Sequence, residues 1–280
     1  AGTAIEGCAT NAGTFVGPLL TELIGYPELT PYKGGWCGNE LFPEAFSDDV
    51  KKQAAEMTER LGDALYKANY RGYFEVDYLI DLDTNDVYLG ELNARITGIS
   101  AMTNMSNFCN DTIPLFLFHL LEYSDVKLTL SPKDYNLKSI TDGATGSASQ
   151  IIYKTTKAEP KIIETAPVSG IYTLKDGQLN LVKESYKRRD ALKPNEIFIK
   201  RIMGVGEYTY KGADLAILFL NKPLKESETK LNSFANEWIR AISNAYKLRD
   251  LTDEEKQLMD RYKNSTGFLK GFNKDKEETS

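Results

Sequence analysis

Residues 72–98 read GYFEVDYLIDLDTNDVYLGELNARITG, and the fold predicted for this chain depends on them. We interpret the stretch as an antiparallel hairpin of two strands, 72–80 and 87–95. The three-residue loop Asp83-Thr84-Asn85 can join them, because Asn85 tolerates the left-handed backbone conformation that such a loop requires.

The register of this hairpin brings oxygen-bearing side chains together. It pairs Asp77 with Glu91 and Glu75 with Asn93. Side chains two apart in a strand share a face, so these four and Arg95 project on one side. Directly opposed residues have Cβ atoms about 5 Å apart, and carboxylates at that spacing repel each other unless a cation lies between them. Such oxygens suit Mg²⁺, which takes one or two carboxylates and completes its shell with water and phosphate oxygens.

Toward the turn, the next side chains on this face are apolar: Leu79 and Leu89. We therefore expect a pocket with an acidic end. The alternative is a surface hairpin whose charged face is simply solvated. A one-residue slip of one strand would also separate the predicted ligands.

The composition is that of a globular protein. The 280 residues are 41% hydrophobic, 26% charged and 11% aromatic, which allows one or two cores and argues against a disordered chain. The net charge of −6 argues against a broad nucleic-acid surface. No apolar run reaches the length of about 18 residues that a membrane span needs. The separated cysteines, Cys8, Cys37 and Cys109, favour a reducing compartment, so we expect a cytoplasmic protein.

Local patterns predict the flanking elements. Ser47 is an expected N-cap, followed by aspartates that suit the positive end of a helix dipole. Further helices are expected at about 98–122 and 224–247. Residues 25–46 are expected to form a long loop rich in Gly and Pro, a kind of loop that is more often functional than accidental. The other predicted strands are 3–8, 14–24, 150–154, 160–164, 169–174, 179–184, 196–202 and 207–220.

Two domains are expected. One covers residues 1–130 and contains the metal site, and a small β-rich domain with a long helix covers 150–250. The polar stretch 131–149 is the expected connection, and 251–280 a C-terminal helix with a loose tail. Because a strand begins already at Thr3 and the chain does not start with Met, we expect further sequence upstream.

The hairpin resembles the metal-binding strands of the ATP-grasp superfamily, in which an acidic strand, a short hairpin and Glu-x-Asn follow one another. The second strand here reads Glu91-Leu-Asn93-Ala-Arg95. Asp77 stands where the first carboxylate of the family is expected, with Glu75 as the alternative. The resemblance implies that Asp77, Glu91 and Asn93 hold magnesium ions that bridge the phosphates of ATP.

The resemblance also implies roles for neighbouring residues. Arg95 matches a catalytic arginine that steadies negative charge on the reacting group. Leu79 matches an apolar residue packed against adenine. Thr97 and Gly98 occupy a small-residue loop next to the acceptor substrate, and Trp36 is expected to line the acceptor pocket.

The resemblance extends to other segments and covers about residues 1–250. Two segments are similar to a bacterial peptide-ligase-type subgroup, and three to the small domain of biotin-carboxylase-like proteins. They are 15–25 and 31–39, and then 166–174, 196–201 and 212–218. The implied fold is α+β: an ATP-grasp C-terminal subdomain, an antiparallel sheet with helices, followed by a small β-rich domain of the biotin-carboxylase C-terminal type.

The chain departs from the family in two ways. The glycine-rich loop over the phosphates, the ATP-binding lysines and the adenine hinge normally precede the point where this chain begins. We therefore expect a missing N-terminal ATP-grasp segment, without which the chain is incomplete for activity. After Asn93 the bicarbonate-branch signature is replaced by Ile96-Thr-Gly-Ile-Ser100, which favours amide-bond formation over carboxylation.

Three further residues are candidates for a role in the site or in the core. Lys33 lies beside two glycines, where backbone can approach a ligand closely, and it either meets a γ-phosphate or substrate carboxylate or is a solvated loop lysine. His119 lies in an apolar run and is interpreted as a packed helix residue. A nucleophilic Cys37 is disfavoured, because no other histidine could activate it.

Together these features predict an ATP-dependent carboxylate–amine ligase that works through an acylphosphate, with ATP and Mg²⁺ as cofactors. The expected partners are a small-molecule carboxylate and an amine or peptide, and neither nucleic acid nor a membrane. Whether the protein forms a homo-oligomer is left open by the sequence. Two alternatives remain: a biotin-carboxylase-like enzyme that uses bicarbonate, and a non-catalytic nucleotide- or partner-binding fragment.

Overall fold

The computed structural model describes residues 2–109, 113–124, 126–142, 148–191 and 193–265. The strands are β1 (Gly2–Thr10), β2 (Gly13–Val16), β3 (Leu20–Ile24), β4 (Trp36–Leu41), β5 (Gly72–Ile80), β6 (Val87–Asn93), β7 (Ala148–Lys154), β8 (Lys161–Thr165), β9 (Gly170–Lys175), β10 (Gln178–Glu184), β11 (Ile197–Arg201), β12 (Tyr208–Thr209), β13 (Asp214–Leu220), β14 (Lys225–Ser227), β15 (Lys230–Leu231) and β16 (Lys247–Arg249). The helices are α1 (Asp48–Lys67), α2 (Ser100–Cys109), α3 (Leu115–Tyr123), α4 (Pro132–Asp142), α5 (Ser233–Ala245) and α6 (Asp253–Ser265), with short 3-10 turns η1 (Pro43–Ala45) and η2 (Arg188–Asp190). Within these ranges no helix is long and apolar enough to cross a membrane.

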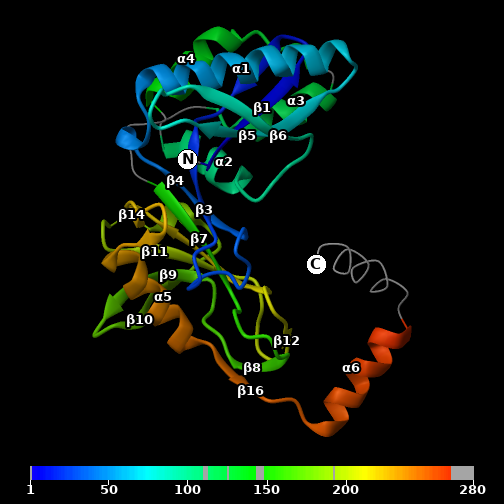
Figure 1. The fold of residues 1–280 in the computed structure, drawn as a ribbon, viewed down its shortest axis with the longest axis vertical. Coiled ribbons are helices and arrows are strands. Elements are labelled where there is room, and N and C mark those ends of the chain that lie inside the picture. The colour runs from blue at the N-terminus through cyan, green and yellow to red at the C-terminus, as the bar shows by residue number, and fades with distance from the viewer. Residues whose placement is uncertain (1, 110–112, 125, 143–147, 192, 266–280) are drawn as a thin grey trace.

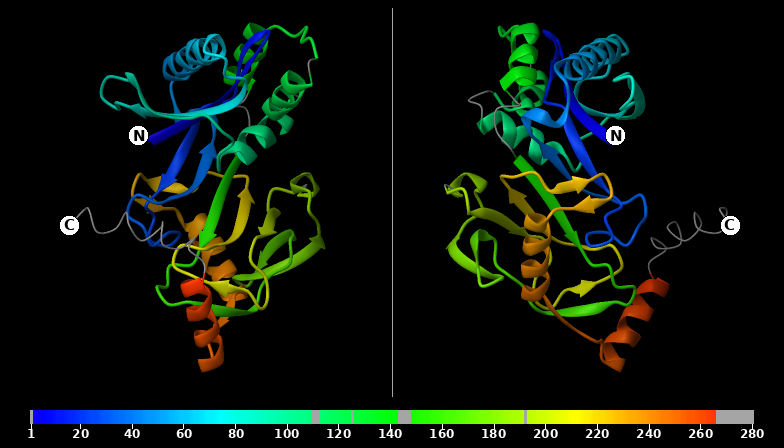
Figure 2. Two further views of the ribbon diagram at one scale, coloured as in Figure 1. Left: turned by 90° about the vertical axis from the view of Figure 1, so that its right-hand side faces the viewer. Right: turned by 60° about the vertical axis from the view of Figure 1, so that its left-hand side comes forward.

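One antiparallel sheet runs through the whole molecule. Its 11 strands follow the order β10-β9-β11-β13-β7-β4-β3-β1-β5-β6, with β2 paired to β1. Helices α1 to α4 surround its β1–β5–β6 end, and α5 lies against the other end (Figure 1). Strands β3, β4 and β7 run between the two ends (Figure 2). A mixed fold with a large antiparallel sheet confirms the predicted α+β class.

Each end of the sheet has its own core. At the β1–β5 end, helix α1 packs Val50 and Ala54 against Ile5, Phe74 and Val76. Its N-cap is Ser47, as predicted: the side-chain oxygen accepts a hydrogen bond from the backbone N–H of Val50. A second core contains the α5 residues Trp238 and Ile242 together with residues of β7, β11 and β13, including Ile151, Ile199 and Leu218. Successive side chains of a strand point to opposite faces of the sheet, so the α1 core takes alternate residues of β5: Phe74, Val76, Tyr78 and Ile80.

Four predicted elements are divided in the structure. The run 14–24 forms two strands, and the expected loop 25–46 contains β4, which pairs with β3 and β7. The expected helix 98–122 forms α2 and α3, with Pro114 as the N-cap of the second helix. The expected strand 207–220 breaks at Gly212, whose φ of +83° lies in the left-handed region.

Two further predicted segments, a helix and a connection, differ from the structure. The expected helix 224–247 begins only at Ser233, capped by Asn232, because the preceding residues form β14 and β15. The polar connection 131–149 contains α4. Asn136 in this helix accepts a hydrogen bond from the N–H of Val16 at 2.7 Å and donates one to the carbonyl of Thr14 at 3.0 Å. The expected C-terminal helix corresponds to α6, and the predicted loose tail beyond it, 266–280, lies outside the described residues.

Candidate functional site

The hairpin of β5 and β6 has the predicted register at its open end. Glu75 lies opposite Asn93, and Asp77 opposite Glu91. Because paired residues project on the same face, the four side chains share one side of the sheet, as expected.

Closer to the turn the hairpin differs from the prediction. The register shifts by one residue after Asp77, where Gly90 is an extra residue in β6 and forms a β-bulge. Leu79 therefore lies opposite Tyr88 and not opposite Leu89. The strands have the predicted inner bounds, 80 and 87, whereas β6 ends at Asn93 and not at the predicted residue 95. Asn85 does take the left-handed conformation, with a φ of 62°.

Hydrogen bonds connect the predicted ligands. The Asn93 amide donates to Oδ2 of Asp77 at 3.5 Å, and the Arg95 guanidinium donates to Oδ1 of Asn93 at 3.1 Å. Glu75 is buried at 3% exposure, Asp77 and Asn93 are half-buried, and Glu91 is exposed. The face is thus a half-enclosed acidic surface that opens to solvent at Glu91.

Strands β1 and β3 add two more carboxyl groups to this face. Glu6 lies directly opposite Glu75, and Glu22 on β3 interacts electrostatically with Asp77. Burial, and then the charge of Asp77, raises the pKa of Glu22 to about 7. Burial, and then the hydrogen bond and charge of Asp77, raises the pKa of Glu75 far above its ordinary value of 4.5.

This donor set fits an open magnesium site better than a closed metal cage. Nowhere in the described part of the chain do three His, Cys, Asp or Glu side chains lie close enough together to hold a metal. Mg²⁺ in nucleotide enzymes is usually held by one or two carboxylates, with phosphate and water oxygens completing the shell. Two opposed residues, Asp77 and Glu91, with the neighbouring amide of Asn93, meet that requirement.

The loop after β6 is anchored on the buried carboxylate of Glu6. Thr97 Oγ1 donates to Glu6 at 3.3 Å, and the hydroxyls of Ser100 and Tyr73 donate to the same carboxylate. Burial raises the pKa of Glu6 to about 7 despite these hydrogen bonds. Glu6 was not predicted as a site residue from the sequence. A glutamate within the apolar run of β1 is nevertheless an unusual core residue, and this could have indicated a role for it.

The predicted acceptor residues come together on the same side. A Cβ atom added to Gly98 would lie 2.5 Å from the ring of Trp36, so the loop lies directly on this indole. Thr97 is the adjacent residue. Gln150, which donates to the carbonyl of Gly98, and its partner Asn39 were not predicted, because their proximity arises only from strand pairing.

Leu79 and Lys33 are exposed, as Glu91 and Arg95 are. Leu79 is 59% exposed on β5. Lys33 is exposed in the loop between β3 and β4, where the hydroxyl of its neighbour Tyr32 donates to the carbonyl of Lys211 at 3.1 Å. His119 packs against Phe116 and Tyr123, as predicted for a packed helix residue.

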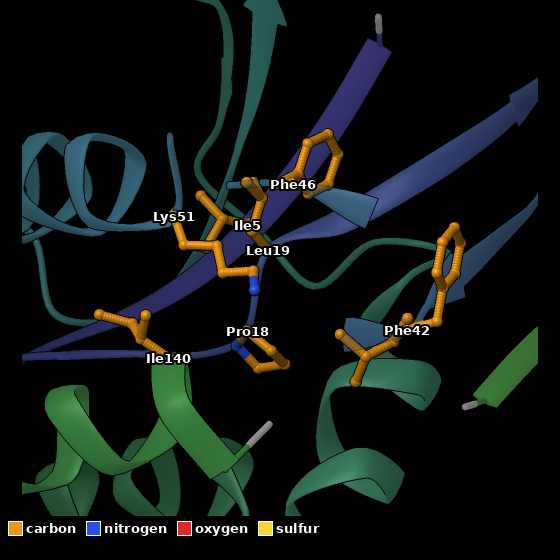
Figure 3. A pocket seen from close by; sticks show the side chains of 8 residues that line it. Ile5, Pro18, Leu19, Phe42, Phe46, Lys51 and Ile140 are labelled. Atoms are coloured by element: carbon orange, nitrogen blue, oxygen red, sulfur yellow. The ribbon is translucent and has the colours of Figure 1, made fainter. Parts of the chain in front are cut away.

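A small cavity near α1 is distinct from this acidic face. Its lining includes Ile5, Pro18, Leu19, Phe46 and the half-buried Lys51 (Figure 3). Its volume of about 10 Å³ is room for about one water molecule. Ile5 also points away from the face of its neighbour Glu6. This cavity is therefore too small and wrongly placed to bind substrate for the acidic site.

Comparison with known proteins assigns the fold. No protein-family model and no curated protein matches the sequence. Among solved structures, the chain is similar to biotin carboxylase of Campylobacter jejuni in a beta-gamma-ATP complex, with a TM-score of 0.54 and 9% identity over 89% of this chain and 46% of that chain. It is also similar to the biotin carboxylase domain of Hydrogenobacter thermophilus 2-oxoglutarate carboxylase with MgADP, ADP and bicarbonate (TM-score 0.51, 11% identity, 90% of this chain and 46% of that chain).

A third similar structure is pyruvate carboxylase of Rhizobium etli, with a TM-score of 0.53 and 11% identity over 97% of this chain and 23% of that chain. The chain spans about half the length of the two biotin carboxylases. Identity at this level shows the fold alone. The chain therefore has the fold of about half of a biotin carboxylase, which confirms the predicted resemblance.

Proposed function

We propose that this chain contributes the magnesium–nucleotide site of an ATP-dependent carboxylate–amine ligase. The observation that carries the proposal is the opposition of Asp77 and Glu91 on β5 and β6, with the Asn93 amide 3.5 Å from the Asp77 carboxylate. The fold supports the proposal, because two of the similar solved structures contain nucleotides.

In this proposal Asp77, Glu91 and Asn93 would hold Mg²⁺. The bound ion would neutralise negative charge on the phosphates of ATP. Glu75 interacts with Asp77 through a side-chain hydrogen bond and orients that carboxylate. The exposed Leu79 side chain offers an apolar surface for adenine. Lys33 is a second candidate cation for a phosphate or a substrate carboxylate.

The reaction takes two balanced steps. A carboxylate oxygen of the first substrate attacks the γ-phosphorus, the bond to the β-phosphate oxygen breaks, and ADP leaves. The nitrogen of an amine then attacks the acyl carbon, inorganic phosphate leaves, and the amine loses a proton. Arg95, oriented by its hydrogen bond to Asn93, stabilises the negative charge that develops on the carbonyl oxygen in the second step.

The acceptor side is formed by Trp36, Thr97 and Gly98. The ring of Trp36 and the small Gly98 are in contact, so a flat apolar wall lies beside the reacting centre. Thr97 is held by Glu6, which fixes the loop relative to β1. These residues would orient the amine and exclude water from the acylphosphate.

A bicarbonate-using reaction is the second candidate, because the Hydrogenobacter thermophilus domain with the same fold contains bicarbonate. In that case bicarbonate would replace the carboxylate substrate and no amine would be required for ADP release. The sequence Ile96-Thr-Gly-Ile-Ser100 after the Glu-x-Asn motif favours the amine-dependent reaction.

The test is ADP release by the full-length protein with ATP and Mg²⁺, screened against amino acids, peptides and bicarbonate, and repeated with a chelator. We expect release that requires both a carboxylate and an amine and that is abolished by chelation. Glu91→Gln should abolish it, whereas Asp83→Asn in the exposed loop of the same hairpin should not. Release that is unchanged in Glu91→Gln would overturn the proposal, and release with bicarbonate alone would favour the second candidate.

A further inference from the structure

We propose that Asn39 and Gln150 are positioning residues for the loop at residues 94–99, which joins β6 to α2. Both lie outside the hairpin, on β4 and β7, and they pair directly across these strands. The inference rests on the proposed function, because this loop carries Arg95, Thr97 and Gly98.

The two amides form a hydrogen-bonded chain that ends on the loop. The Trp36 indole N–H donates to Oδ1 of Asn39 at 3.0 Å, and Nε2 of Gln150 donates to the same oxygen at 3.4 Å. Nε2 of Gln150 also donates to the carbonyl of Gly98 at 3.1 Å. Since Gly98 in turn lies on the Trp36 ring, the four residues form a closed ring of contacts.

The orientation of both amides follows from their partners. Asn39 must present its NH₂ group to the carbonyl of Thr21, at 3.3 Å, so its oxygen faces the Trp36 indole and Gln150. Gln150 therefore meets two acceptors, the Asn39 oxygen and the Gly98 carbonyl, and can satisfy both only through its NH₂ group. A donor is required at this position.

Gln150 performs this role at a cost to stability. It is fully buried, and its Oε1 atom has no hydrogen-bond partner within the described ranges. A buried acceptor without a donor is destabilising, whereas an apolar side chain of similar size avoids that penalty. The contribution of Gln150 is therefore the placement of Gly98 and not the stability of the core.

The loop is thus held at two separate points. Glu6 on β1 holds Thr97, and the ring of amides on β4 and β7 holds Gly98. These two points are consecutive residues, so β1 and β7 together hold one short stretch of the loop. Holding Gly98 fixes the direction in which the loop leaves Arg95, so Gln150 acts on the reacting centre through this loop.

The test is Gln150→Met, which keeps the volume of the side chain and removes the donor. We expect an unfolding midpoint that is unchanged or higher, and amide hydrogen exchange in residues 94–99 that is about tenfold faster. The kcat for ADP release should fall by about tenfold or more, with the KM for ATP unchanged, because a small displacement of reacting groups is costly. Ser149→Ala is the matched control: Ser149 is also buried on β7, but its hydroxyl bonds the carbonyl of Lys222 on the other face.

A second variant reaches the loop from its other side. Gly98→Ala places a methyl group against the Trp36 ring and should accelerate exchange in the same residues while leaving Gln150 intact. Unchanged exchange in both variants would overturn the inference. If exchange changes as expected but the wild-type protein releases no ADP with any acceptor, the proposed function fails and the positioning role stands. If the wild type is active and Gln150→Met leaves both exchange and kcat unchanged, the positioning role fails alone.

Discussion

The two faces of strands β1 and β5 are made of alternate residues and have opposite chemistry. Toward α1 they present Ile5, Phe74 and Val76, which pack in an apolar core. Toward the loop after β6 they present Glu6, Glu75 and Asp77, and burial raises the pKa of both glutamates. The first face is explained by the burial of apolar surface. The second is unfavourable for folding, so the comparison points to function on the acidic face.

The largest effect should come from removing the charge of a predicted metal ligand. Asp77→Asn should lower Mg²⁺-dependent ADP release by about 100-fold or more, because even residues that only orient metal ligands contribute 10–100-fold. Its folding should change little, which circular dichroism and an unfolding curve would establish. Full activity in a folded Asp77→Asn protein would contradict the functional reading of this face.

The apolar face should respond in the opposite way. Ile5→Ala removes a fully buried side chain and should cost about 2–5 kcal/mol of unfolding free energy. Chemical denaturation measures this loss directly. In the remaining folded protein the Mg²⁺ dependence of ADP release should be unchanged, and an altered Mg²⁺ requirement would show that the two faces are not separable.

Glu6 should make stability depend on pH. Burial raises its folded pKa from 4.5 to about 7, so the folded state binds more protons than the unfolded state. Protonated Glu6 stabilises the folded state, and this stabilisation is complete below pH 4.5. As the pH rises through about 7 it is lost, which lowers the unfolding free energy by roughly 3 kcal/mol. In Glu6→Gln this part of the pH dependence should disappear from denaturation curves recorded between these values. A curve with the wild-type slope would assign the buried proton to another group.

The smallest effect should have the opposite sign. His119 Nδ1 accepts a hydrogen bond from the N–H of Tyr73 at 3.1 Å, and burial lowers the pKa of its imidazole. The stability it contributes is present above the ordinary pKa of 6.5 and is lost as the pH falls below it. His119→Phe should remove this decline in thermal unfolding experiments. A decline that persists in the variant would trace to other groups.

The sequence predicted the parts of the site that depend on local spacing. Alternation along two adjacent strands was sufficient to pair Asp77 with Glu91, and one left-handed Asn85 was sufficient to place the turn. The bulge at Gly90 was not predicted, although a glycine within a strand is a signal for one. It shifted the partner of Leu79 by one residue.

Features that depend on distant parts of the chain were not predictable in this way. Asn39 and Gln150 are 111 positions apart and meet only because β4 and β7 are neighbours. Helix α4 was interpreted as a polar connection, because its buried face mixes the polar Asn136 and Ser139 with only two larger apolar side chains, Tyr135 and Ile140. Local propensity cannot reveal contacts of this kind, since they arise from tertiary packing.

The pairing of β4 with β7 also has a mechanical consequence. A continuous ladder of backbone hydrogen bonds joins the two ends of this molecule, so a rotation of one end against the other would have to shear those bonds. The two ends should therefore move together as one rigid body. Spectroscopic labels on α1 and α5 should keep the same separation whether or not nucleotide is present.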